Sequence, residues 1–134
     1  MSLADILVQR GELAVAEQTL LRVQGEISRR WGDDVKPSYR MNQKLGEVYF
    51  RGGRLAEARA EFETALSGYR RLLAADHPDV LAVASRLGEV LAMLGDVEAA
   101  AALLTEACDG RRRQFGDTSE AARESCEARA RLAG

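Results

Sequence analysis

The sequence contains one histidine, His77, and two cysteines, Cys108 and Cys126, which are the side chains best suited to nucleophilic or metal chemistry. A catalytic histidine needs a nucleophile and an orienting group beside it, and a zinc site needs about three or four clustered ligands. The sequence has no second histidine and no cluster of cysteines to complete either set. We therefore predict no catalytic residue, no metal site and no cofactor, so the chain is not expected to be an enzyme.

The two cysteines are expected to be packing residues. Neither belongs to a CxxC pair, and two are too few to hold a secreted scaffold together. In the internal repeat described below, Cys108 aligns with Leu66 and Cys126 with Ala84, which are apolar positions. We predict buried free cysteines that act as small hydrophobes, with neighbouring sulfurs as the alternative if the last helix packs on the preceding one. The start "MSLADILVQRG" lacks the features of a secretory signal, which favours a cytoplasmic protein.

Charge and composition restrict the class of partner. The formal net charge of −2 argues against a nucleic-acid footprint, and no apolar run approaches the ~20 residues that cross a bilayer. The sequence has no GxxxxGK[ST] or GxGxxG motif that would hold a phosphate group. Arg111 to Arg113 are expected to form a solvated helix end, where cations complement the helix dipole. We predict a protein or peptide partner, and neither nucleic acid nor a membrane.

The tetrapeptide LGEV occurs at residues 45–48 and again at residues 87–90, so the copies start 42 positions apart (87 minus 45). Many other positions align at the same spacing, from the start of the chain to its end. The aligned sets are Gly11, Gly53 and Gly95; Ala16, Ala58 and Ala100; Leu20, Phe62 and Leu104; Val23, Ala65 and Ala107; and Asp5, Glu47 and Glu89. One internal repeat therefore accounts for most of the chain.

Each repeat is predicted to form two helices. Within residues 39–53 the apolar side chains of Met41, Leu45, Val48 and Tyr49 share one helical face, and glycines follow. A second apolar stripe covers residues 54–73, and residues 77–95 and 96–116 repeat the scheme. Pro78 suits a first helical turn, with the flanking Asp76 and Asp79 offering a helix cap. These expected helices must position any site that the chain carries.

The glycine of each LGEV copy has a predicted packing role. Gly46 and Gly88 lie inside expected helices, where a glycine costs about 1 kcal/mol relative to alanine. We expect them to let two helix backbones approach closely, with Ala58 and Ala100 on the second helix of each pair.

The residues resemble the tetratricopeptide repeat family. Its pattern is matched by Leu45-Gly46, Tyr49, Gly53, Ala58, Phe62 and Ala65. The 42-residue spacing and the HPDV sequence at residues 77–80 are similar to the kinesin-light-chain-like branch. The resemblance implies an all-α fold, a right-handed superhelix of antiparallel helix pairs, with His77 at the start of a helix. It also implies a protein-binding scaffold whose first helices line a concave face.

The repeat register also predicts the domain organisation. We expect a single domain over residues 1–134, with a partial first repeat at 1–34, a second at 35–76, a third at 77–116 and a capping helix at 117–134. The register gives the first repeat a turn at Gly11, with only about two turns of its first helix before it. Three repeats are near the lower limit for an independent array, so the domain is interpreted as part of a larger bacterial regulatory or scaffold protein.

The predicted peptide-binding groove consists of side chains on the first helices that face away from the core. These are Arg40, Gln43, Lys44, Glu47, Phe50, Arg51, Ser85, Arg86, Glu89 and Met93, with Ala82, Asp5, Val8 and Gln9 beside them. Because the row of acids would repel a carboxylate, a mixed or partly basic peptide is expected. The alternatives are a solvated helix face with pairs such as Lys44 with Glu47, and a self-association element in which two chains form a homodimer.

Overall fold

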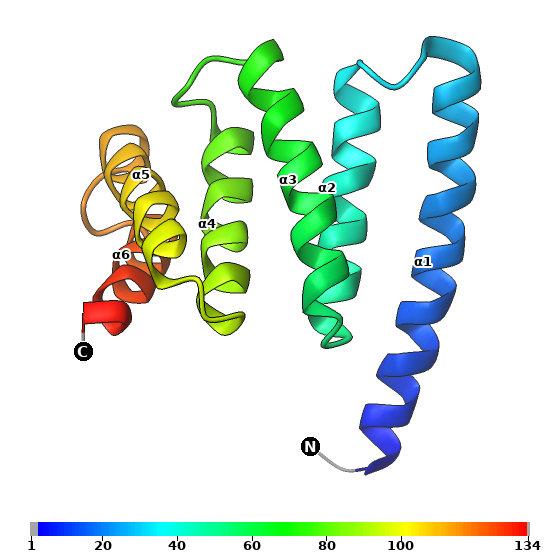
Figure 1. Cartoon of the computed structure of the whole chain (residues 1–134), viewed down its shortest axis with the longest axis horizontal. Coiled ribbons are helices and arrows are strands. Elements are labelled where there is room, and N and C mark those ends of the chain that lie inside the picture. Colours follow the sequence, from blue (N-terminus) through cyan, green and yellow to red (C-terminus); the bar gives the residue numbers. More distant parts are fainter. Residues whose placement is uncertain (1–2, 134) are drawn as a thin grey trace.

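The structure is a computed structural model that describes the backbone of residues 3–133 and the side chains of residues 11–132. The described backbone forms six helices joined by short loops (Figure 1). They are α1 (Leu3–Trp31), α2 (Lys36–Arg51), α3 (Leu55–Leu72), α4 (Pro78–Met93), α5 (Val97–Phe115) and α6 (Glu120–Ala133). Residues 3–133 contain no strand, which confirms the prediction of an all-α fold.

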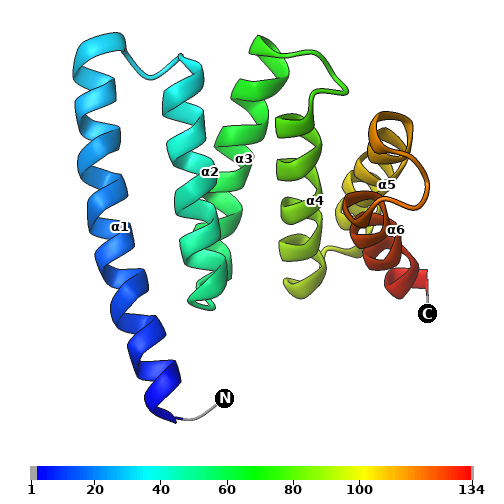
Figure 2. The ribbon, with the colours of Figure 1, turned by 180° about the vertical axis from the view of Figure 1, so that it is seen from behind.

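Successive helices run in opposite directions and lie side by side from α1 at one end to α6 at the other (Figures 1 and 2). The pairs α2 with α3 and α4 with α5 pack closely, and α3 also packs on α4. The α6 helix packs on α5 and touches α4, while α1 packs on α2. The array therefore consists of two complete antiparallel pairs, with one helix added at each end.

The turn inside each complete pair depends on a glycine. Gly53 has a φ of 76° and Gly95 a φ of 92°, a left-handed conformation that side chains with a Cβ rarely adopt. The α5 helix then begins at Asp96, whose carboxylate accepts a hydrogen bond from the Ala99 N–H at 3.3 Å. The short turns fold each second helix directly back on the first.

The start of α4 differs in one detail from the sequence prediction. His77 is the capping residue, and its Nδ1 accepts a hydrogen bond from the Asp79 N–H at 3.0 Å. Asp76, proposed above as a cap, instead accepts a hydrogen bond from Arg113 at 3.1 Å. Pro78 occupies the first turn of α4 as expected. His77 therefore has a structural partner at the start of a helix.

The core forms where the aligned apolar positions meet between the helices. Phe62 and Ala58 of α3 are fully buried, and so is Leu45 of α2. A Cβ built on Gly46 would lie 2.6 Å from the Phe62 ring, and one on Gly88 would lie 2.7 Å from Cγ of Leu104. The close approach expected at these two glycines is confirmed, and it lets each second helix bury its large side chain against the first.

The N-terminal helix contradicts the turn predicted at Gly11. The α1 helix is continuous from Leu3 to Trp31, and Gly11 lies inside it. Two helical turns before a glycine are too short to be stable as a separate helix, whereas continuing α1 keeps the backbone hydrogen bonds in one ladder. The first turns of α1 consequently extend past the end of α2 (Figures 1 and 2).

The C-terminal helix is held by a disulfide that sequence reasoning did not favour. Cys108 of α5 is bonded to Cys126 of α6, so the prediction of two free cysteines is wrong. The alternative of neighbouring sulfurs is correct, because α6 packs on α5 and brings the two apolar positions together. Disulfides persist mainly in oxidising compartments. The cytoplasmic prediction therefore loses the support that it drew from unpaired cysteines.

Candidate partner-binding groove

Three hollows meet at Glu47 and form a groove along one side of the array. The first, of about 550 Å³, lies between α1 and α2 and is lined by Leu13, Ala16 and Val48 among others. The second, of about 400 Å³, extends over α2 toward α4. The third, of about 140 Å³, includes Arg86 of α4, Arg111 of α5 and Glu124 of α6. The first helix of each complete pair, α2 and α4, therefore contributes to this groove.

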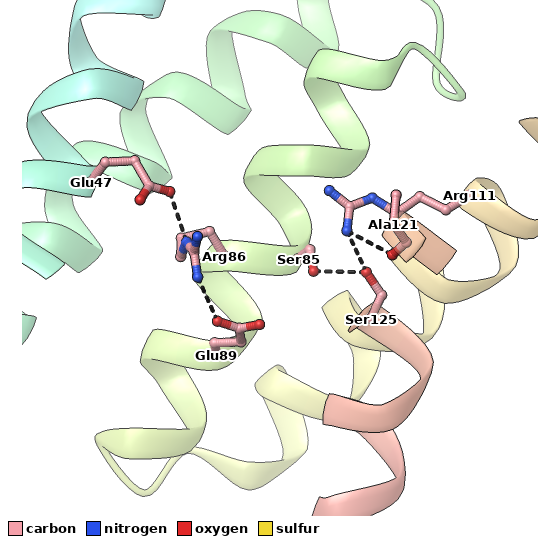
Figure 3. Close-up of polar contacts among 7 residues, drawn as sticks. All are labelled: Glu47, Ser85, Arg86, Glu89, Arg111, Ala121 and Ser125. Carbon is pink, nitrogen blue, oxygen red and sulfur yellow. Dashed lines mark hydrogen bonds and ion pairs between the residues drawn. The ribbon is translucent and has the colours of Figure 1, made fainter. Parts of the chain in front are cut away.

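Arg86 lies at the centre of the groove and binds two acids at once. Its Nε donates a hydrogen bond to Glu47 at 2.7 Å, and its Nη1 donates one to Glu89 at 2.8 Å (Figure 3). The guanidinium also stacks over the Phe50 ring, 4.8 Å from the centroid. Burial opposes the charge on Arg86, but the hydrogen bonds and charges of the two glutamates hold its pKa above its ordinary value. Arg86 therefore stays cationic and ties α2 to α4.

The predicted row of acids is largely compensated within the chain. Glu47 and Glu89 both belong to the Arg86 cluster, and Glu89 has only 16% of its side chain exposed. The intrahelical pair of Lys44 with Glu47, which was one alternative above, is not among the ion pairs of the described side chains. The negative charge of this row is consequently less available to a partner than the sequence suggests.

Three cations remain on the open side of α2. Arg40, Lys44 and Arg51 are all exposed, and Arg40 lies 3.9 Å from Asp79 of α4. On α4, Met93 has 61% of its surface exposed, and Ala82 is half-buried. The exposed side chains near the hollows thus combine positive charge with one apolar side chain, Met93, which itself lines none of the three hollows.

Gln43 and Ser85, two further residues of the predicted groove, are also engaged in internal contacts. The Gln43 side chain accepts a hydrogen bond from the Tyr69 hydroxyl at 2.9 Å. Ser85 is buried, and its hydroxyl lies 2.8 Å from that of Ser125 on α6 (Figure 3). We therefore leave Ser85 out of the groove, because the helix that follows α5 covers it. Asp5, Val8 and Gln9 have side chains that lie outside the described residues.

The arginine run at the end of α5 contains one residue that the sequence misplaced. Arg112 and Arg113 are exposed and pair with Asp117 and Asp76, as a solvated helix end requires. Arg111 is instead half-buried and donates to the Ala121 carbonyl at 3.0 Å and the Ser125 hydroxyl at 2.8 Å (Figure 3). Burial lowers the pKa of Arg111. This side chain is a structural contact to α6.

Sequence reasoning also missed two features that repeat at 42 residues. Gly68 and Gly110 are 42 positions apart, and a Cβ at either would overlap the side chain of Tyr39 or Leu81, the aligned residues of α2 and α4. Similarly, Arg71 binds Asp34 at 2.8 Å as Arg113 binds Asp76. Both the glycine pair and the arginine–aspartate pair are visible in the sequence when it is aligned at 42 residues. Tyr39 donates to the same Asp34 at 2.6 Å, and these bonds lower the pKa of Asp34.

The described residues lack the features of a metal site and of a membrane span. They contain no group of three or more histidine, cysteine or acidic side chains placed to hold a metal ion. No helix among them combines the length and the apolar character of a membrane span.

The aligned helix pairs and the groove beside their first helices define a helical-repeat array of the kind that binds proteins. The tetratricopeptide repeat family matches residues 39–113 in one version and residues 2–69 in another. The first match covers more than half of the chain, so the chain belongs to the tetratricopeptide repeat family. This family generally consists of protein-interaction modules, and the predicted superhelix of antiparallel helix pairs is confirmed. No curated protein matches the sequence.

Solved structures with the same arrangement include kinesin light chain repeats. The chain is similar to two crystal structures of kinesin light chain nearly identical repeats from Podosopora anserina, with a TM-score of 0.84 and 21% identity in each. It is also similar to BtubC (BKLC) from P. vanneervenii, with a TM-score of 0.82 and 21% identity. Each match covers 97% of this chain but only 61%, 62% and 51% of the respective structures. These likenesses show the fold.

Proposed function

We propose that this chain is a protein-interaction module that holds a peptide or partner segment in the groove along α2 and α4. The observation that carries the proposal is the meeting of three hollows at Glu47, beside three exposed cations of α2. A hollow with apolar lining and exposed charge beside it suits the capture of a peptide. A non-enzymatic scaffold within a larger protein fits this reading.

The charge arrangement supports a peptide of mixed charge. Since Arg86 already compensates Glu47 and Glu89, acidic side chains of a ligand have Lys44 and Arg51 available, together with Arg40, which also pairs with Asp79. An apolar side chain of the ligand would contact Met93. The self-association alternative also uses the α1–α2 hollow and Lys44, so it would compete with a peptide for part of this groove.

A peptide array followed by fluorescence anisotropy tests the proposal. The double substitution Arg40→Ala with Arg51→Ala should weaken binding of the selected peptides by about tenfold, since it removes two partly exposed charge contacts. Arg59→Ala is the matched control, because Arg59 is an exposed arginine on α3 that pairs with Glu63 away from the groove. Equal affinities for the double variant, the control and the original chain would reject the groove assignment.

A further inference from the structure

Other helices only partly cover the face of α1 that carries the aligned repeat positions. In α3 the aligned residues Ala58, Phe62 and Ala65 have no exposed surface, because α2 and α4 lie against them. The corresponding residues of α5 are buried to the same degree: Ala100, Leu104 and Ala107. In α1 the same positions are only half-buried: Ala16, Leu20 and Val23. None of the described helices therefore covers this face of α1 as α2 covers α3.

The hollow of about 550 Å³ between α1 and α2 lies where such a covering helix would pack. Its lining includes Leu13 and Ala16 of α1 and Val48 of α2, and Leu20 continues the apolar surface into the adjoining hollow. An amphipathic helix fits such a surface, with its apolar side on these residues and its polar side toward solvent. The same geometry is filled in the complete pairs by α2 over α3 and by α4 over α5.

The chain itself contains a segment with the matching register. Residues 3–6, with the sequence LADI, align with both copies of LGEV, so Ala4 corresponds to Gly46 and Gly88. Those glycines pack against Phe62 and Leu104, which align with Leu20. The register therefore places Ala4 against Leu20 in a completed first pair.

Charge complementarity supports the same placement. In the complete pairs, Arg86 of α4 binds Glu47 of the preceding first helix at 2.7 Å. One repeat earlier, the aligned residues are Lys44 and Asp5. Lys44 is exposed beside the hollow and has no ion pair among the described side chains. A helix carrying Asp5 in this position would give Lys44 the acidic partner that Arg86 already has.

The continuity of α1 decides which copy supplies the segment. Because α1 continues as one helix through Gly11, residues 4 and 20 of one chain are about 24 Å apart along it, at about 1.5 Å per residue, and cannot meet. We infer that two copies of this chain associate by placing the N-terminal turns of each α1 in the α1–α2 hollow of the other. This inference stands on other observations than the proposed peptide binding, although the α1–α2 hollow and Lys44 take part in both.

The absence of a side chain at Gly11 fits the geometry of such a dimer. If Ala4 of one copy meets Leu20 of the other, the two α1 helices run antiparallel and cross close to Gly11 of both chains. A Cβ at Gly11 would have no atom within 4 Å in the single chain. Gly11 thus leaves space at the crossing and allows the two helix backbones to approach.

Cysteine cross-linking tests the contact directly. The double variant Ala4→Cys with Leu20→Cys, oxidised at high protein concentration, should give a covalent dimer on a non-reducing gel, and reduction should return it to the monomer. Ala4→Cys with Gln18→Cys is the matched control, because Gln18 is exposed outside the hollow. A cross-linked monomer would show that the segment folds back on its own chain. That result, or the absence of any specific cross-link, would overturn the inference.

Charge exchange between chains provides an independent test by light scattering. Asp5→Lys alone and Lys44→Glu alone should each weaken the dimer by about tenfold, since two symmetry-related pairs change at once. An equal mixture of the two variants should recover the dimer, because each interface of the mixed dimer again joins opposite charges. Gly11→Glu should abolish the dimer without harming the helix. A chain that stays monomeric at high concentration, or a mixture that behaves like its components, would contradict the inference.

Discussion

In each complete pair, a glycine of the first helix lets the second helix approach closely: Gly46 in α2 and Gly88 in α4. Replacing Gly46 by alanine puts a methyl group against the fully buried Phe62 ring, which has little room to move. We expect a loss of about 1–3 kcal/mol in the free energy of unfolding, the usual effect of overpacking. Urea denaturation measures this loss. Gly25→Ala is the control, since a Cβ there would meet only an Arg29 nitrogen at 3.7 Å, an ordinary contact, and alanine favours a helix by up to about 1 kcal/mol.

Equal stabilities of the two alanine variants would show that Gly46 is not a packing residue.

The tyrosine hydroxyls lie at contacts between helices and respond to pH. Burial, together with the hydrogen bond that Tyr49 donates to Glu17 at 3.0 Å, raises the pKa of Tyr49 to about 12. Since an unfolded tyrosine ionises near pH 10, the folded state holds this proton more tightly. The contribution of Tyr49 is therefore fully present below pH 10 and is lost as the pH rises toward 12.

Measurements of unfolding free energy against pH test this expectation. Stability should decline between pH 10 and pH 12, and Tyr49→Phe should make that decline shallower. The tyrosinate absorbance of the folded chain should also remain low at pH 10, because the pKa values of Tyr39 and Tyr69 are raised as well. A normal titration midpoint near pH 10 would contradict the contacts described for these hydroxyls.

At the residue level, the sequence predicts the contacts that repeat and misses those that do not. Gly46 and Gly88 could be interpreted because both complete repeats contain them. Ser85 and Arg111 could not, because both bind Ser125, a polar residue of α6 in a position that is Val83 in α4. Because buried polar groups are nearly always hydrogen-bonded, a serine at this otherwise apolar position indicates that another polar side chain lies beside it.

Among the elements, α6 depends on a covalent bond for part of its stability. The bond between Cys108 and Cys126 closes a loop with a sequence separation of 18 residues. In the chain-entropy description, a loop of this size stabilises the folded state by about 3 kcal/mol. We therefore expect the double variant Cys108→Ala with Cys126→Ala to lose up to that amount in denaturant unfolding.

Hydrogen exchange should locate the effect of this variant in α6. The amides of α6 should exchange faster, while those of α2 and α3 should keep their protection, because α6 packs mainly on α5. Uniformly faster exchange across all helices would show that the bond supports the whole array instead.

The sequence predicts the helix pairs well but not the end helices. Residues 35–116 contain two full copies of the repeat, so each interpretation of α2 and α3 could be checked against α4 and α5. At Gly11 the same alignment predicted a turn. A glycine ends a helix only when the segment that follows can bury apolar surface by packing back on that helix. The interior of α1 shows that an aligned glycine alone does not determine a turn.

The whole molecule is a curved stack whose groove depends on pairing between repeats. That a partner binds in this groove remains a proposal, and only the placement of α2 and α4 on one side was predictable, from the alignment at 42 residues. The charge of the groove was not, because the Arg86 cluster joins residues from two repeats and changes which groups a partner can reach. Electrostatic statements about such grooves therefore need the contacts between neighbouring helices as well as the sequence of each.

Chemical-shift mapping by NMR on the isotope-labelled chain tests the groove most directly. Peptides selected on the array should shift the backbone amides of residues 40–51 and 82–93, which belong to α2 and α4. The outward faces of α3 and α5 should remain unchanged. Shifts concentrated on α3 and α5, or no shifts at saturating peptide, would contradict a partner-binding groove along the first helices.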